Sequence, residues 1–267
     1  MKYIKQIDNR KLYGDGIGGV DLFDFSHAND KEESRVEAVA TVASICYGKP
    51  PKDAGKLVER LWTESGGLPS SAFEFIRWGS TDWSSSINAS LRNDRELKTF
   101  EEIAQHELDR KDAHISRQIA RHNKRIATFR VKVPIFIARQ VMRHRSFSYQ
   151  ELSRRYTTDK QVPLEFWLPQ MMPNWAATLN DTYRKSMNTY SLMLLDLPPE
   201  QARCVLPQGA YTEFWMMGNT AAWRNYFKLR LDLHTQKEHR ELAQAMADLL
   251  KEHQPVLWAA VDPQGAE

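Results

Sequence analysis

Apolar residues recur at helical spacing along much of the chain, with two shorter apolar runs between the helical stretches. Apolar positions three and four residues apart indicate one buried helix face. The predicted helices are 35–46, 53–64, 135–145, 178–195 and 240–252. Residues 126–133 are predicted to form a strand, and the aromatic-rich run 211–217 fits either a strand or a buried helix. We therefore expect a mainly helical chain around a small sheet.

The helix predicted at 135–145 has a marked polar face. Pro134 suits its start, because the first helical position needs no backbone N–H. The apolar stripe consists of Ile135, Ala138 and Met142. The polar face consists of Gln140, Arg143 and His144, with Arg139 beside it. A break is expected at Ser146 to Ser148.

After this break, Glu151, Ser153 and Arg155 alternate along the chain. An extended loop would present all three on one side, because side chains alternate across extended backbone. The helix end and the loop would then enclose an anion and a planar group beside it.

Five arginines, one histidine and a single acid lie between positions 139 and 155. A guanidinium offers paired donors that match phosphate and carboxylate oxygens. The net charge of the whole chain is only +3, so the basic character is local. A local basic cluster favours a small phosphorylated molecule over a long nucleic-acid track.

Composition indicates a cytoplasmic protein with no membrane partner. No apolar run approaches the ~20 residues that span a bilayer, and the N-terminus lacks a signal-peptide core. The two cysteines, Cys46 and Cys204, predict neither a disulfide framework nor a cysteine zinc site. A chain of 267 residues can form one large domain or two small ones.

Several other patterns are predicted to carry no chemistry. Residues 14–19 spell GxGxxG, but the polar segment before them and the lack of a helical pattern after them indicate a flexible loop. No metal site is predicted. The histidine groups rejected as metal ligands are His106 and His114 with Asp109, which lie among charges, and His234 with His239, which do not stack on one helix face.

The run RHRSFSYQELSRRY resembles the signature of the flavin-dependent thymidylate synthases, RHRxxS followed by an acid and then SxRY. The matching positions are Arg143, His144, Arg145, Ser148, Glu151, Ser153, Arg155 and Tyr156. Gln150 departs from the usual asparagine but keeps an amide. Residues 202–207 resemble the family's ARxVLP segment, and the likeness extends over about 129–255.

The resemblance implies an α+β fold: a mainly helical single domain, 1–267, around a central, mostly antiparallel sheet. It implies reductive methylation of dUMP to dTMP. FAD would be the redox cofactor, and methylenetetrahydrofolate and NADPH would be co-substrates. It also implies a homotetramer whose sites are assembled from more than one subunit, with no nucleic-acid partner.

The resemblance also implies the site residues. The dUMP site would consist of Gln140, Arg143, Glu151, Ser153, Arg155, Arg203 and Arg230. The FAD contacts would be Ser71, Arg143, His144, Arg145, Glu151, Asn219 and Asn225. Arg155 and Arg203 would hold the phosphate, and Arg230 would stabilise charge on the uracil ring. Arg230 and Ser153 are the predicted catalytic residues.

The N-terminal half matches the family less closely. The family's HxSPFEH-like segment has two counterparts here: residues 69–75, which keep a hydroxyl at Ser71, and residues 114–116, which offer His114 and Ser116. Ser71 is favoured. A strand is predicted to begin at 73–77, and the segment at about 78–124 is extra. Ala221 stands where the family usually has an arginine.

Two alternative functions stay open, and two further residue groups are interpreted as structural. A flavin-dependent relative with a modified pyrimidine product would share these residues. A nucleic-acid-binding module could use the arginines with Phe147, Tyr149 and Tyr156 as stacking surfaces. Cys204 is interpreted as small core filling, because adjacent helical residues point about 100° apart and Arg203 would face the site. The cluster Phe214 to Met217 is interpreted as core.

Overall fold

The chain forms an α+β structure built on a five-stranded antiparallel sheet, here from a computed structural model that describes residues 4–25, 32–64, 126–169 and 173–264. The order across the sheet is β1-β2-β3-β5-β4, and every neighbouring pair is antiparallel. The strands are β1 (Lys5–Lys11), β2 (Gly19–Asp24), β3 (Ile126–Pro134), β4 (Ser148–Glu151) and β5 (Tyr211–Asn219).

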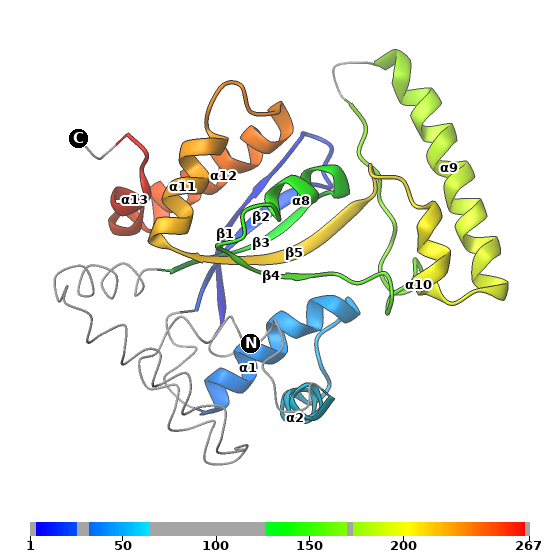
Figure 1. Ribbon diagram of the computed structural model, residues 1–267, viewed down its shortest axis with the longest axis horizontal. Coiled ribbons are helices and arrows are strands. Elements are labelled where there is room, and N and C mark those ends of the chain that lie inside the picture. The colour runs from blue at the N-terminus through cyan, green and yellow to red at the C-terminus, as the bar shows by residue number, and fades with distance from the viewer. Residues whose placement is uncertain (1–3, 26–31, 65–125, 170–172, 265–267) are drawn as a thin grey trace.

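Helices cover both faces of the sheet (Figure 1). One face carries α8 (Ile135–Val141), α11 (Thr220–Arg230), α12 (Lys237–His253) and α13 (Pro255–Val261). The other face carries α1 (Glu32–Ser44), the 3-10 helix η1 (Ile45–Tyr47) and α2 (Ala54–Glu64). At one end of the sheet lie the long α9 (Pro173–Asp196), the short α10 (Pro199–Ala202) and the 3-10 helix η3 (Arg203–Val205).

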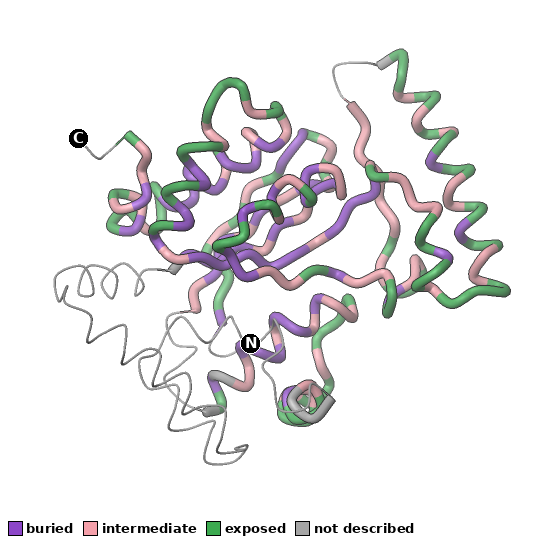
Figure 2. The backbone as a smooth tube through the Cα atoms, viewed as in Figure 1, coloured by how far each residue is buried: buried purple, intermediate pink, exposed green. Residues whose placement is uncertain are grey.

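The core forms two layers, because side chains alternate across each strand. On β5, Phe214 and Met216 pack toward α11 and α12, whereas Trp215 and Met217 pack toward α1. A strand buried on both faces reads as a continuous apolar run. This explains why the sequence left 211–217 open between strand and buried helix, and why β5 is buried along most of its length (Figure 2). The interpretation of Phe214 to Met217 as core is confirmed.

Most of the predicted elements that lie in the described residues are present with shifted ends. The helix predicted at 35–46 is α1 followed by η1, and α2 begins one residue after its predicted start. The helices α9 and α12 are longer than predicted at both ends. The strand predicted at 73–77 and the extra segment at about 78–124 lie outside the described residues.

The N-terminal hairpin of β1 and β2 was not predicted, because its first strand is polar. β1 is mostly exposed at the edge of the sheet, so its sequence carries little of the apolar alternation that marks a strand. Residues 12–18 form the loop between the two strands. The prediction of a glycine loop, rather than a dinucleotide-binding turn, is confirmed.

The helix predicted at 135–145 ends early. α8 stops at Val141, and the backbone N–H of His144 donates to the Val141 carbonyl at 3.0 Å, a three-residue spacing that belongs to a turn. The predicted shared face is therefore wrong: Arg143 is exposed, whereas His144 is buried. The apolar stripe is also shifted, since Ile137, Ala138 and Val141 are the buried residues of α8.

Gly48 supports the loop that follows β4, and replacing it should destabilise the fold. Its φ of +64° is left-handed, and a Cβ there would lie 2.0 Å from Val162 Cγ2. Gly16 is the matched control, since its φ is +75° with no heavy atom within 4 Å of a Cβ. We expect Gly16→Ala to cost about 1 kcal/mol from backbone strain, and Gly48→Ala at least about 1 kcal/mol more. Urea denaturation measures both, and equal losses would contradict the close approach to Val162.

Candidate functional site

A cavity of about 410 Å³ lies where α8, the end of β4, the start of β5 and η3 meet. Its polar lining consists of Arg139, Glu151, Arg154, Arg203, Cys204, Gln208, Tyr211 and Thr212. Three of these residues are arginines and one is an acid, so the cavity suits an anionic ligand that also offers a hydrogen-bond donor.

Glu151 is held at the cavity by the neighbouring strand. The Thr212 hydroxyl donates to Glu151 Oε1 at 2.7 Å. Surrounding protein displaces water from the carboxylate and raises its pKa, while the Thr212 hydrogen bond and the nearby charges of Arg203 and Arg139 oppose that rise. Neither Thr212 nor Arg139 was among the predicted site residues. A threonine within an apolar run gives no signal of a ligand site in the sequence, and Arg139 was placed only beside the polar face of the predicted helix.

The loop after β4 turns sharply, so the predicted alternation of Glu151, Ser153 and Arg155 is wrong beyond Ser153. The backbone N–H of Tyr156 donates to the Ser153 carbonyl at 3.0 Å, which closes a turn over 153–156. Arg155 then lies on the surface, where it pairs with Glu200 at 2.7 Å. A phosphate bound by Arg155 would therefore replace or share this ion pair.

Arg154 braces the same loop. Its Nη1 donates to the Val162 carbonyl at 2.6 Å, and its Nη2 donates to the Pro163 carbonyl at 3.1 Å. One guanidinium thus ties both ends of the segment that presents Ser153 and Arg155. This bracing role was not predicted.

Arg230 and His144 form a second polar group on the α11 side of α8. Arg230 Nε donates to His144 Nε2 at 2.9 Å. Burial, together with the adjacent Arg230 charge, lowers the pKa of His144 to about 4. His144 is therefore a neutral ring that accepts from Arg230, and it packs edge-on against Tyr226.

Gln140 joins this second group through a residue that was not predicted. Gln140 Nε2 donates to Gln236 Oε1 at 2.5 Å, and Gln140 Oε1 lies 3.3 Å from His239 Nδ1. His239 is fully buried, and its ring lies 6.4 Å from that of His144. The sequence analysis considered His239 only as a rejected metal ligand with His234, one residue before the predicted helix 240–252.

Arg143 and Arg145 are exposed, and neither has an acidic partner among the described residues. These two exposed arginines are the sequence neighbours of the buried His144, and their guanidiniums suit the phosphates of a large ligand. Asn225 is exposed on α11. Asn219 caps α11 instead, since its Oδ1 accepts from the Ala222 N–H at 2.9 Å.

The interpretation of Cys204 as core filling is wrong. Cys204 is exposed, and it lines the cavity together with Arg203. The prediction assumed that the side of the helix facing away from Arg203 would be buried, whereas none of the three residues of η3 is buried. Cys46 is partly buried, and its thiol lies 3.1 Å from the Glu151 carbonyl.

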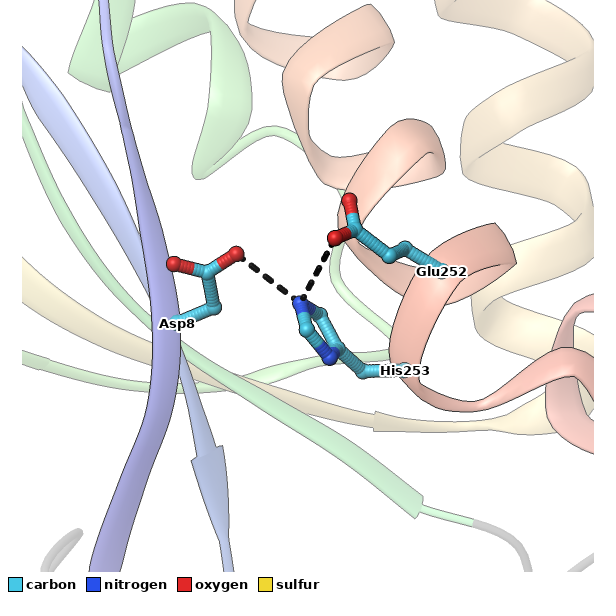
Figure 3. A group of neighbouring side chains, drawn as sticks. All are labelled: Asp8, Glu252 and His253. Atoms are coloured by element: carbon cyan, nitrogen blue, oxygen red, sulfur yellow. Dashed lines mark hydrogen bonds and ion pairs between the residues drawn. The ribbon is translucent and has the colours of Figure 1, made fainter.

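Asp8 on β1 and Glu252 and His253 on α12 lie close together (Figure 3). His253 Nε2 lies 2.8 Å from Asp8 Oδ2 and 3.7 Å from Glu252 Oε1. The Arg10 guanidinium pairs with both carboxylates. Because the positive charge of Arg10 already neutralises these carboxylates, we interpret the group as a salt-bridge cluster that ties β1 to α12.

Several predicted residues lie outside the described part of the chain. These are Ser71, His114 and Ser116, the alternatives for the flavin segment, and His106 and Asp109 of the rejected metal group. Within the described residues, no helix is both long and apolar enough to cross a membrane.

The structure thus separates the predicted dUMP residues into two groups on either side of α8. Glu151 and Arg203 meet in the cavity, with Ser153 and Arg155 on the adjoining loop. Gln140 and Arg230 lie beside α11 and α12, together with the predicted flavin residue His144.

Comparison with known proteins gives the family. The family model described as thymidylate synthase complementing protein matches residues 29–256. The chain belongs to this family.

Three similar proteins are each named flavin-dependent thymidylate synthase. The protein of Pseudothermotoga lettingae is 38% identical over 139 residues, which cover 47% of this chain and 62% of that protein. The Thermotoga neapolitana protein is 32% identical over 57% of this chain and 76% of its own length. A Thermus thermophilus protein is 32% identical over 57% of this chain and 64% of its own length. The chain thus spans less than two thirds of two of these relatives.

Proposed function

We propose that the protein converts dUMP to dTMP by reductive methylation, with methylenetetrahydrofolate as carbon donor, FAD as redox cofactor and NADPH as reductant. The observation that carries the proposal is the pairing of Arg230 with the neutral ring of His144, whose sequence neighbours Arg143 and Arg145 are both exposed. This geometry offers a fixed cation for an activated ring and free donors for phosphate groups. Family membership and the names of the relatives support the same reaction.

Arg230 is proposed to act on the uracil ring. Because its Nε is engaged by His144, its Nη atoms point along a fixed direction and remain available to an oxygen of the ring. A donor that is oriented before reaction stabilises developing negative charge without reorganisation. The flavin supplies the redox chemistry when bound, so the protein needs no nucleophile of its own.

Arg203 and Arg155, with Ser153 and Gln140, are proposed to hold the nucleotide phosphate. Arg203 lines the cavity beside Glu151, which we propose as a contact to both nucleotide and flavin. Arg143 is proposed to be shared between dUMP and FAD, and His144, Arg145, Asn219 and Asn225 are proposed to contact FAD. Ser71 is proposed as a further flavin contact.

The protein is proposed to be a single-domain homotetramer of the flavin-dependent thymidylate synthase fold, cytoplasmic and without a nucleic-acid partner. The separation of the dUMP residues into two groups supports sites assembled from more than one subunit, since one chain does not bring them together. Exposed apolar side chains on α9, among them Leu192 at 65% and Leu195 at 78% exposed, support an extensive subunit contact.

The test is reconstitution followed by product identification. The purified protein is expected to retain FAD absorbance after desalting. With dUMP, methylenetetrahydrofolate and NADPH, it should yield a product 14 Da heavier than dUMP by mass spectrometry, since a methyl group replaces one hydrogen. A hydroxymethyl product, 30 Da heavier, would indicate a relative with a modified pyrimidine product. Absence of flavin and of any product would overturn the proposal.

Cys204→Ala should keep most of the activity. Cys204 lines the cavity, so it is placed where a nucleophile could act, but the proposed reaction requires no covalent bond to the protein. We expect dTMP formation within about threefold of the unchanged protein, as for other changes without transition-state contacts. Complete loss of turnover, with FAD still bound, would instead identify Cys204 as a nucleophile.

A further inference from the structure

Gln140, Gln236 and Glu238 form a chain of hydrogen bonds that ends at the buried ring of His239. Gln236 Nε2 donates to Glu238 Oε2 at 2.9 Å, and Gln140 Nε2 donates to Gln236 Oε1 at 2.5 Å. The last link joins Gln140 Oε1 to His239 Nδ1 at 3.3 Å. The chain connects α8, which carries Gln140, to the start of α12.

Glu238 sets the direction of every link. A carboxylate accepts hydrogen bonds, so Gln236 turns its NH2 group toward Glu238 and its oxygen toward Gln140. Gln140 must then present its own NH2 group to Gln236, which leaves its oxygen facing His239. An amide oxygen only accepts, so His239 must donate, and its proton lies on Nδ1.

The other ring nitrogen of His239, Nε2, is buried without a hydrogen-bond partner among the described residues. Burial and the nearby charge of Arg230 lower the pKa of His239 to about 3, so the ring is neutral at neutral pH. Nε2 is then an acceptor. An unpartnered buried acceptor is unfavourable, and an apolar side chain would fill the position without that penalty. A histidine at this position differs from an apolar residue in one useful way, because only the histidine can form the hydrogen bond with Gln140.

His239 also lies beside the group that holds Arg230. Its ring is 5.8 Å from that of Tyr226 and 6.4 Å from that of His144, which accepts from Arg230. Two neutral imidazoles therefore sit next to each other. One orients Arg230, and the other contacts Gln140.

We propose that His239 is a positioning residue that fixes the side-chain amide of Gln140 in one orientation toward the nucleotide. An amide has two N–H donors and two acceptor lone pairs. Gln236 and His239 engage one of each, and the second N–H and second lone pair remain for the ligand. The role in nucleotide binding rests on the proposed function, whereas the direction of the hydrogen bonds does not.

The test compares His239→Asn with His239→Leu. The two new side chains have nearly the same shape, but only asparagine can place an N–H near the position of Nδ1. We expect His239→Leu to raise the KM for dUMP about tenfold, the effect of one lost hydrogen bond, with kcat changed less than about threefold. His239→Asn should restore the KM to within about threefold. Equal KM values for the two variants would overturn the positioning role.

Nitrogen-15 NMR of the full-length protein tests the proposal without turnover. The ring nitrogen signals of His239 are those missing from the spectrum of His239→Leu. They should show a protonated Nδ1 and an unprotonated Nε2. The Gln140 side-chain amide should be rigid in the unchanged protein and in His239→Asn, but mobile in His239→Leu. A ring protonated on Nε2, or a Gln140 amide equally rigid in all three proteins, would overturn the proposal. If no protein converts dUMP while these signals are as expected, the proposed function fails and the positioning of Gln140 stands.

Discussion

Arg230→Ala is expected to lose about 10²–10³-fold in the rate of dTMP formation, even at saturating dUMP. The loss follows from removing one oriented donor for charge that develops on the ring. Because Arg230 is held by His144 and contacts the ring rather than the phosphate in our proposal, binding should suffer less than chemistry. The variant should therefore still bind FAD and oxidise NADPH.

Arg155→Ala should show the opposite pattern. Arg155 lies on the surface in an ion pair with Glu200, and the proposed phosphate contact is the same in the ground and transition states. Loss of such uniform binding raises KM and leaves kcat nearly unchanged. Single-turnover kinetics at increasing dUMP separate the two effects.

Arg10→Ala is the matched control, since Arg10 pairs with Asp8 on β1, at the opposite edge of the sheet from β4 and the cavity. It should change neither parameter. A reversed pattern, with Arg230→Ala rescued by high dUMP and Arg155→Ala not rescued, would show that the two arginines are assigned to the wrong ends of the nucleotide.

The stability of the protein should fall by about 4 kcal/mol between pH 7.5 and pH 5 from two buried histidines alone. The folded state keeps His144 neutral down to a pKa of about 4 and His239 down to about 3. In the unfolded chain both rings protonate near pH 6.5. Protons therefore bind only the unfolded state in this window, so acid favours unfolding, by about 2 kcal/mol per ring at pH 5.

Comparison of variants isolates this effect from other titrations. Glu151 and Glu213 have raised pKa values, so their contribution has the opposite sign in the same window. His239→Asn removes one ring and should flatten the pH dependence by about 2 kcal/mol in urea denaturation at the two pH values. His234→Asn is the control, because the His234 side chain is 98% exposed, and it should leave the slope unchanged. Identical slopes for all three proteins would show that His239 accepts a proton in the folded state.

The sequence by itself determined the family and much of the helical frame. Patterns of three and four residues gave α1, α2, α9 and α12, because one buried face of a helix is a local property of the chain. The eight signature positions between Arg143 and Tyr156 pointed to the family that the comparison then gave. The sequence did not predict β1, because this edge strand is polar and only its pairing with β2 identifies it as a strand.

Only the tertiary structure decided which predicted site residues meet. The early end of α8 buries His144 against Arg230, 86 positions further along the chain, and leaves Arg143 exposed. The turn after Ser153 separates Arg155 from Glu151 and pairs it with Glu200. In the sequence, His239 was considered only as a metal ligand, and that reading was rejected. Its contact with Gln140 arises because α12 packs on α8, and such packing depends on the whole core rather than on either helix alone.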